Sequence, residues 1–236
     1  MANLTEQRLN LLLRGEPEVL LAWTVEWRIR RLGLCVAGIV AGAGLYGAAM
    51  GSWRGPLQAL FVAIKFPLIV LLTTVGNALL NAVLAPLLGL NLSLRQSLLA
   101  VLMSFTIAAA ILGSFSPLIA FLVWNAPTMT PDVRISGSTY SFIQLTNVAT
   151  IAFAGTVANL RLVQLLSRYS GGAAAARRVL LAWLAGNLFL GSQLAWILRP
   201  FIGSPNLPVE FLRASAFKGN FYETVFHAVL RLLQIN

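Results

Sequence analysis

Five long stretches without a charged residue alternate with short polar segments along most of this chain. They cover residues 32–53, 66–94, 96–131, 135–160 and 179–198. A helix needs about 20 apolar residues to cross the ~30 Å hydrocarbon core of a bilayer. Within that core only helices or closed barrels can hydrogen-bond all their backbone groups, and nothing in the stretches is typical of barrel strands. The pattern predicts an all-α, polytopic transmembrane helix bundle with about five spans and amphipathic flanking helices.

Proline and glycine mark the ends of the predicted spans, which are 32–51, 67–88, 98–124, 140–160 and 179–198. Pro67 opens the second span, and we expect residues 57–65 to form a separate short amphipathic piece before it. Pro117 predicts a kink in the third span, because it removes a helical hydrogen bond and clashes with the preceding turn. Residues 161–178 are expected to form a basic loop broken by glycine.

The chain is expected to contain one membrane domain, residues 32–199, between an amino-terminal segment, 1–31, and a carboxyl-terminal tail, 200–236, with an amphipathic helix near its end. Apolar residues and arginines mix in the amino-terminal segment as in helices that lie at headgroup level. That segment either anchors the first span or docks a partner. The expected membrane-interface anchors are Trp23, Trp27, Arg28, Arg30, Arg31 and Lys65. Lys65 is expected to snorkel from the end of its span.

The composition excludes a soluble protein. Hydrophobic residues make up 58% and charged residues 10%, whereas about 25% charged is ordinary for soluble domains. The net charge of +10 comes from fifteen Arg and two Lys against seven acids. These basic residues lie beside the spans, so anionic lipid headgroups are the expected partners and nucleic acid is not. The excess of Arg over Lys, with many Ala, Gly and Leu, indicates a GC-rich bacterial genome and hence the bacterial inner membrane.

Basic residues also predict the orientation. With the amino terminus inside, the inner side carries ten arginines: Arg8, Arg14, Arg28, Arg30, Arg31, Arg95, Arg161, Arg168, Arg177 and Arg178. The outer loops carry only Arg54, Lys65 and Arg134 before the tail. Because cytoplasmic loops are enriched in Lys and Arg, we expect a cytoplasmic amino terminus and a carboxyl terminus outside.

The chain has few groups for chemistry. Its one cysteine, Cys35, lies inside the first span, so neither an internal disulfide nor a cysteine zinc site is expected. That span is expected to be retained and not cleaved as a signal peptide, since a long segment precedes it. No HExxH, GxSxG or Walker motif occurs, and the single histidine, His227, is expected to be an interfacial residue near Glu223. The sequence predicts no enzymatic activity, no cofactor and no metal.

Small residues follow one face of the first span. Gly38 and Gly42 form a GxxxG pair, and Gly47 extends the series. Residues of this size let two helix backbones approach closely. The partner helix belongs either to the same chain or to a second copy in a homo-oligomer.

Amides are the main polar groups inside the spans. Thr73, Asn77 and Asn81 recur every four residues on the second span, and Asn147, Asn159 and Asn187 lie in the fourth and fifth. Such side chains either bond between helices or line a hydrated path. No carboxylate accompanies them inside a span, which argues against a proton- or sodium-coupled transporter.

Five spans within residues 32–199, a cytoplasmic amino-terminal flank and short connections make the chain resemble the Yip1-type membrane proteins. That family's DLYGP-like and GYP-like signatures have no counterpart here, so no functional residues carry over. The resemblance implies a non-enzymatic membrane organiser working through protein contacts. We therefore expect a structural, accessory or scaffolding subunit of a membrane protein assembly. The alternative is a small channel or transporter subunit with a polar path lined by the intramembrane asparagines.

Overall fold

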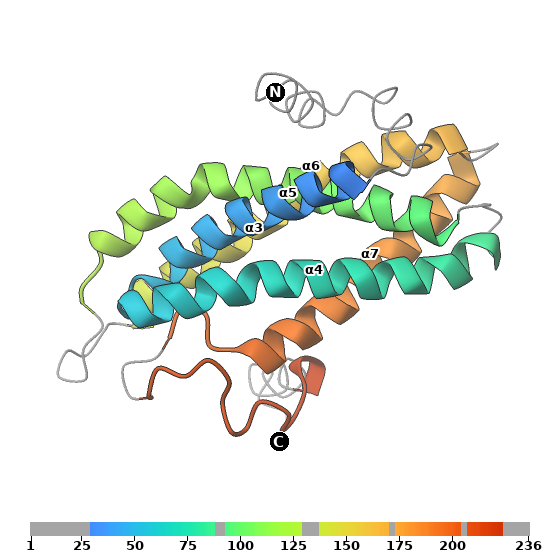
Figure 1. Cartoon of the computed structure of the whole chain (residues 1–236). Coiled ribbons are helices and arrows are strands. Elements are labelled where there is room, and N and C mark those ends of the chain that lie inside the picture. Colours follow the sequence, from blue (N-terminus) through green and yellow to red (C-terminus); the bar gives the residue numbers. More distant parts are fainter. Residues whose placement is uncertain (1–28, 88–92, 129–136, 170–172, 204–206, 224–236) are drawn as a thin grey trace.

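A computed structural model describes residues 29–87, 93–128, 137–169, 173–203 and 207–223. Its long helices are α3 (Ile29–Gly51), α4 (Pro56–Leu87), α5 (Leu94–Trp124), α6 (Gly137–Tyr169) and α7 (Ala173–Leu198). All five are long and apolar enough to cross a membrane, and no strand occurs in the described ranges. The expected all-α multi-pass bundle with five spans is confirmed (Figure 1).

Two connections differ from the sequence prediction. Residues 57–65 are not a separate piece, because α4 runs without interruption from Pro56 through Pro67. Proline is tolerated at a first helical position, as at Pro56, and neighbouring helices let a membrane helix carry an internal proline. The basic loop predicted at residues 161–178 is also mostly helical, since α6 continues to Tyr169 and α7 begins at Ala173.

Pro117 lies inside α5, which continues as one helix to Trp124. The missing N–H of Pro117 would have bonded the carbonyl of Gly113, four residues earlier. The Ser116 hydroxyl donates to that carbonyl instead, at 2.6 Å. This replacement keeps the backbone satisfied, as a lipid environment requires.

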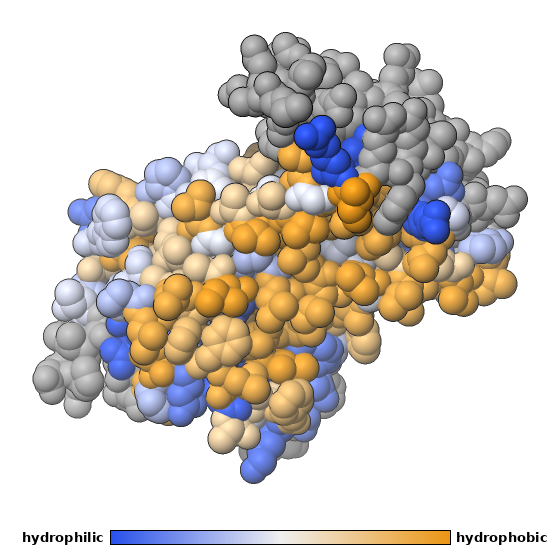
Figure 2. Space-filling model, in the orientation of Figure 1, coloured by the Kyte–Doolittle hydropathy of each residue, from blue (hydrophilic) through white to orange (hydrophobic). Residues whose placement is uncertain are grey.

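The centre of the bundle is α5, which packs against α3, α4 and α6. In the most apolar 18-residue stretch of α5, 56% of the residues are buried, compared with 11% in the corresponding stretch of α7. In Figure 1, α7 runs obliquely across α4, whereas α3 to α6 share a closer direction. The helices are covered outside by apolar side chains, and Figure 2 shows this surface across the middle of one face, with hydrophilic residues gathered toward its edges. Such a surface suits lipid contact.

Gly38, Gly42 and Gly47 of α3 lie in close helix contacts within the chain. A Cβ on Gly42 would overlap the backbone carbonyl of Ala109 on α5, and one on Gly38 would lie 3.0 Å from the Thr106 methyl group. Gly47 faces α4 instead, where a Cβ would lie 2.5 Å from the Val62 carbonyl oxygen. Intramolecular packing therefore occupies these positions, and the homo-oligomer contact stays a prediction.

Most of the expected amino-terminal segment and the end of the carboxyl-terminal tail lie outside the described residues. This holds for Trp23, Trp27 and Arg28, and for His227 with most of the predicted tail helix. Arg30 and Arg31 lie in the first turn of α3, where Arg30 is exposed. Of the tail helix, only its start at residues 221–223 is described.

Candidate functional site

A cavity of about 700 Å³ lies between α4, α5, α6 and α7, at the end of the bundle where α7 leads into residues 199–223. We call this end the tail end. Met50 of α3 and the segment 199–203 also contribute to its wall. The volume falls within the ~300–1,000 Å³ typical of small-molecule sites.

The cavity exists because α6 and α7 diverge. These consecutive helices touch only sparsely, since α7 packs mainly on α4 (Figure 1). The register of α4 and α7 is antiparallel: Asn77 Nδ2 donates to Asn187 Oδ1 at 2.6 Å, and Leu190 lies against Gly76. The tail-side halves of α6 and α7, up to Tyr140 and Arg199, are left as opposite walls of an open space.

Two glycines in the walls leave this space free of side chains at their positions. Gly155 of α6 lines the cavity, and a Cβ built there would meet nothing within 4 Å. Gly191 lines it from α7, where a Cβ would meet only Thr73, at ordinary van der Waals distance. Larger side chains at these positions would extend into the cavity without striking backbone.

Most of the lining is aliphatic or aromatic, with a few polar side chains among them. Thr73 and Asn187 lie on the α4 and α7 side, and Asn147 lies on α6. Asn147 is oriented by Tyr46 of α3, whose hydroxyl donates to Asn147 Oδ1 at 2.8 Å, while Asn147 Nδ2 donates to the Ile143 carbonyl. An apolar chamber with a few placed polar groups is the usual form of a ligand site.

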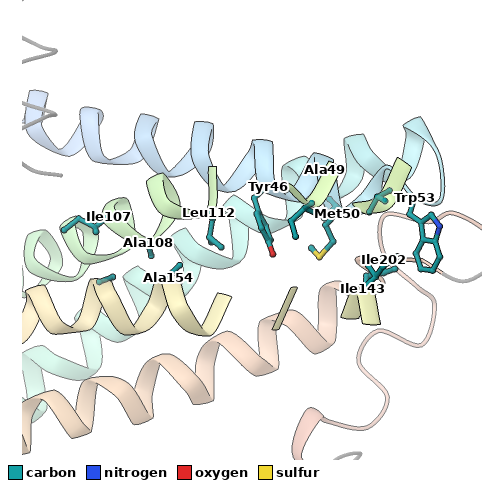
Figure 3. Close-up of a cluster of buried hydrophobic side chains, with 14 residues drawn as sticks. Tyr46, Ala49, Met50, Trp53, Ile107, Ala108, Leu112, Ile143, Ala154 and Ile202 are labelled. Atoms are coloured by element: carbon teal, nitrogen blue, oxygen red, sulfur yellow. The ribbon is translucent and has the colours of Figure 1, made fainter. Parts of the chain in front are cut away.

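Tyr46 belongs to a buried apolar cluster beside the cavity. Figure 3 shows it extending from α3 into the interior, next to Ala49 and Met50. Ile143 of α6 and Ile202 of the tail belong to the same cluster and lie together in that view. The cluster joins α3, α5, α6 and the tail, so the tail-end wall of the cavity is a packed part of the fold.

The segment after α7 is held against α4 by one face of that helix. Gln58 Nε2 donates to the carbonyls of Pro200, at 2.9 Å, and Phe201, at 3.1 Å. Two aromatic pairs add edge-to-face contacts, between Phe61 and Phe211 and between Phe66 and Phe201. These contacts fix residues 199–203 across the tail end of the cavity.

Lys65 takes part in the same contact, which corrects its predicted role as a membrane-interface anchor. Its side chain is fully buried, and Nζ donates to the carbonyls of Glu210, at 3.3 Å, and Pro200, at 3.5 Å. Nζ also lies 5.2 Å from the centre of the Phe211 ring. The sequence prediction placed Lys65 at a span end, but α4 begins nine residues earlier, and the tail covers the ammonium group.

Two guanidinium groups line the cavity at its tail end. Arg199 follows directly after α7, stacks on the Trp196 ring at 3.7 Å and donates to the carbonyls of Trp196 and Ser215. Arg213 lies close enough to act electrostatically on Arg199, Tyr140 and Lys65. Burial, and then the charge of Arg213, lowers the pKa of Arg199 from its ordinary value. Burial raises the pKa of Tyr140, and Arg213 opposes that rise.

The predicted amide set divides into separate groups. Asn77 and Asn187 pair between α4 and α7, whereas Asn147 pairs with Tyr46 on the opposite wall. Asn159 bonds the Gly155 carbonyl of its own helix. Thr73, Asn77 and Asn81 are buried, and the side chain of Asn81 finds no hydrogen-bond partner among the described residues. Thr73, Asn147 and Asn187 reach the cavity; whether these amides serve packing or a hydrated path stays a prediction.

Some residues of the site were not predicted from the sequence. Gln58 and Phe61 share one helix face with Lys65, which the sequence had singled out as an anchor, and this spacing was a usable signal. Arg199 and Arg213 left no such signal in the sequence, because their common position at the cavity depends on the path of the tail. The same holds for Gly155, whose open surroundings depend on the direction of α7.

In the part of the chain that the structure describes, fold and site together define a class: a helical bundle with five membrane-spanning candidates and an apolar cavity with a cationic end. In comparisons with protein-family models, curated proteins and solved structures, nothing matched this chain. The Yip1-type resemblance is therefore neither supported nor refuted.

Proposed function

We propose that this protein is a non-enzymatic, multi-pass membrane protein that holds an elongated apolar or amphiphilic molecule in the cavity between α6 and α7. The observation that carries this proposal is the 700 Å³ cavity itself, with an apolar lining inside the spanning part of the bundle. In a bilayer the molecules that can fill such a space are predominantly lipids and other apolar solutes. A holding role also agrees with the accessory subunit expected from the sequence, because a bound lipid can serve an assembly without chemistry.

The lining supports binding more than catalysis. Its described polar groups are amides, a hydroxyl, a phenol and two guanidinium groups, among them Thr73, Tyr140 and Asn187. These groups orient a ligand by hydrogen bonds or charge. General acid and base catalysis instead uses imidazole or carboxylate groups most often.

The experiment compares retained lipid in two glycine variants. Gly155→Leu places a side chain in the cavity, where a Cβ meets nothing within 4 Å. Gly33→Leu is the matched control, because Gly33 is exposed on α3 and has equally open surroundings. Each full-length protein is purified in mild detergent, and lipids bound after gel filtration are quantified by mass spectrometry.

We expect the wild type and Gly33→Leu to retain about one more lipid per chain than Gly155→Leu, with all three proteins showing the same thermal unfolding. Equal lipid content in all three folded proteins would contradict the proposal.

A further inference from the structure

We propose that the cavity is a site for an anionic lipid, with its headgroup at Arg199 and Arg213 and an acyl chain extending along α6 and α7 to the level of Asn187. This inference rests on the proposed function, and it adds the ligand class and the direction of the ligand. Three features of the site support it: its charge, its length and the level of its cationic end at the membrane boundary.

The charge lies at one end only. Arg199 and Arg213 are the charged side chains among the described lining residues, and both belong to the tail end. The remaining lining is apolar, apart from the amide and hydroxyl groups described above. One cationic end and one apolar end match an amphiphile with a negatively charged headgroup. A neutral hydrocarbon would leave the arginines without a counter-charge.

Arg213 is the group best placed to meet an anion. Arg199 already donates to the Trp196 and Ser215 carbonyls. Among the described residues, no hydrogen-bond acceptor or carboxylate partner is found for the Arg213 guanidinium, and the groups on which it acts include the cations Arg199 and Lys65. Glu210, the nearest acid in sequence, is exposed and contributes its backbone carbonyl to Lys65. A bound anion would relieve the repulsion among these cations.

The length of the site corresponds to half a bilayer. From Arg199 to Asn187 the wall follows α7 for twelve residues, ~18 Å at the helical rise of 1.5 Å per residue. From Tyr140 to Gly155 it follows α6 for fifteen residues, ~22 Å. A bilayer including its headgroups is about 40–45 Å thick, so one lipid of one leaflet has the matching dimension.

The level of the arginines also fits a headgroup. The apolar span of α7 ends at Leu198, and that of α6 begins at Phe142. Arg199 follows the end of the α7 span immediately, and Tyr140 lies two residues before the start of the α6 span. The cationic end of the cavity therefore lies where both spans reach the membrane boundary.

The test offers the full-length protein in mild detergent an equimolar mixture of phosphatidylglycerol and phosphatidylethanolamine with identical acyl chains. Bound lipids are quantified by mass spectrometry after gel filtration. Arg213→Gln removes the charge, and Arg213→Lys keeps it. Lys218→Gln is the matched control, because it removes a tail charge from an exposed residue outside the lining.

We expect the wild type, Arg213→Lys and Lys218→Gln to prefer phosphatidylglycerol. Arg213→Gln should lower the preference about fivefold, the equivalent of about 1 kcal/mol for one cation near anionic lipid, with the total bound lipid unchanged. In the wild type, the preference should shrink as salt is raised toward 1 M, because salt screens the headgroup contact. This measurement needs no variant to fold.

An unchanged preference in Arg213→Gln, or no preference and no salt effect in the wild type, would overturn the inference while leaving the proposed function intact, provided that lipid is still retained. Displacement of the lipid signal by inorganic phosphate would also overturn it, because it would indicate a site for a small free anion. Loss of retained lipid from every protein, the wild type included, would instead defeat the proposed function.

Discussion

The contact between α3 and α5 and the space between α6 and α7 both depend on glycine, with opposite results. At the first, the backbone of Gly42 touches α5 so closely that a Cβ would overlap the Ala109 carbonyl, and the Gly42 Cα lies 3.0 Å from a Cβ built on Gly113. At the second, Gly155 faces a cavity and a Cβ would meet nothing within 4 Å. One glycine lets helices approach, and the other leaves a chamber unfilled.

The difference shows that the direction of the facing helix decides what a small residue does. In the most apolar stretch of α5, 56% of the residues are buried, because α3 and α4 pack closely along this helix. In the corresponding stretch of α7, only 11% of the residues are buried, because α7 crosses α4 obliquely and diverges from α6. Helix association in lipid depends on close van der Waals packing and on bonds between helices. Changes at the two places should therefore differ in kind: loss of stability at the first, and loss of ligand at the second.

The largest effect is expected for Gly42→Leu. Overpacking usually costs about 1–3 kcal/mol, and here the added side chain meets a backbone carbonyl that cannot rotate away. We expect a loss above about 3 kcal/mol, visible as a large drop in the thermal unfolding temperature in detergent. Gly155→Leu, the same substitution in open surroundings, serves as the comparison. Equal stability of the two variants would remove the distinction between contact and chamber.

A smaller loss is expected for Gln58→Leu, which tests the wall that closes the tail end. Without the buried side chain of Gln58, the Phe201 carbonyl loses its donor, and the Pro200 carbonyl keeps only Lys65 Nζ, at 3.5 Å. An unsatisfied buried acceptor costs about 1–3 kcal/mol. We expect a matching loss of stability and faster proteolysis after α7, whereas Thr156→Leu, at an exposed position of α6 outside the cavity lining, should change neither. Unchanged proteolysis in Gln58→Leu would mean that other contacts hold the segment.

A double-mutant cycle of Asn77→Leu and Asn187→Leu tests the bond that holds α7 on α4. Bonds of this kind between membrane helices average about 0.6 kcal/mol and reach about 1.7 kcal/mol. We expect a coupling free energy in that range, measured by unfolding in detergent. The alternative of a polar path predicts something else: a stable double variant that loses conductance in liposomes. Zero coupling with lost conductance would favour the channel.

The smallest effect is expected for Gly155→Ala. Alanine favours a helix over glycine by up to about 1 kcal/mol, and its methyl group meets no atom within 4 Å at this site. Stability should therefore stay equal or rise slightly, while Gly42→Ala should lose stability because its Cβ overlaps the Ala109 carbonyl. Unfolding temperatures of the two variants provide the comparison. A destabilised Gly155→Ala would mean that the chamber is filled by packing.

The sequence predicted the spans because their hydrophobic runs depend on local composition alone. It also predicted close contacts at Gly38, Gly42 and Gly47, since small residues at helical spacing leave a visible pattern. It misplaced Lys65 because Pro67 looked like a helix start, although α4 passes through that proline. The cavity was not predictable, because Arg199, Arg213 and Gly155 come together only through the oblique course of α7 and the path of the tail.

The chamber between α6 and α7 is tested most directly by a phosphatidylglycerol that carries a photoreactive group in its acyl chain. The lipid is reconstituted with the full-length protein, irradiated, and the adducts are mapped by mass spectrometry. We predict adducts on buried cavity residues such as Leu112 and Ala154, and their loss in Gly155→Leu, alongside adducts on outward-facing Leu72 in both proteins. Adducts confined to outward-facing residues, with the same pattern in Gly155→Leu, would contradict a lipid held inside the bundle.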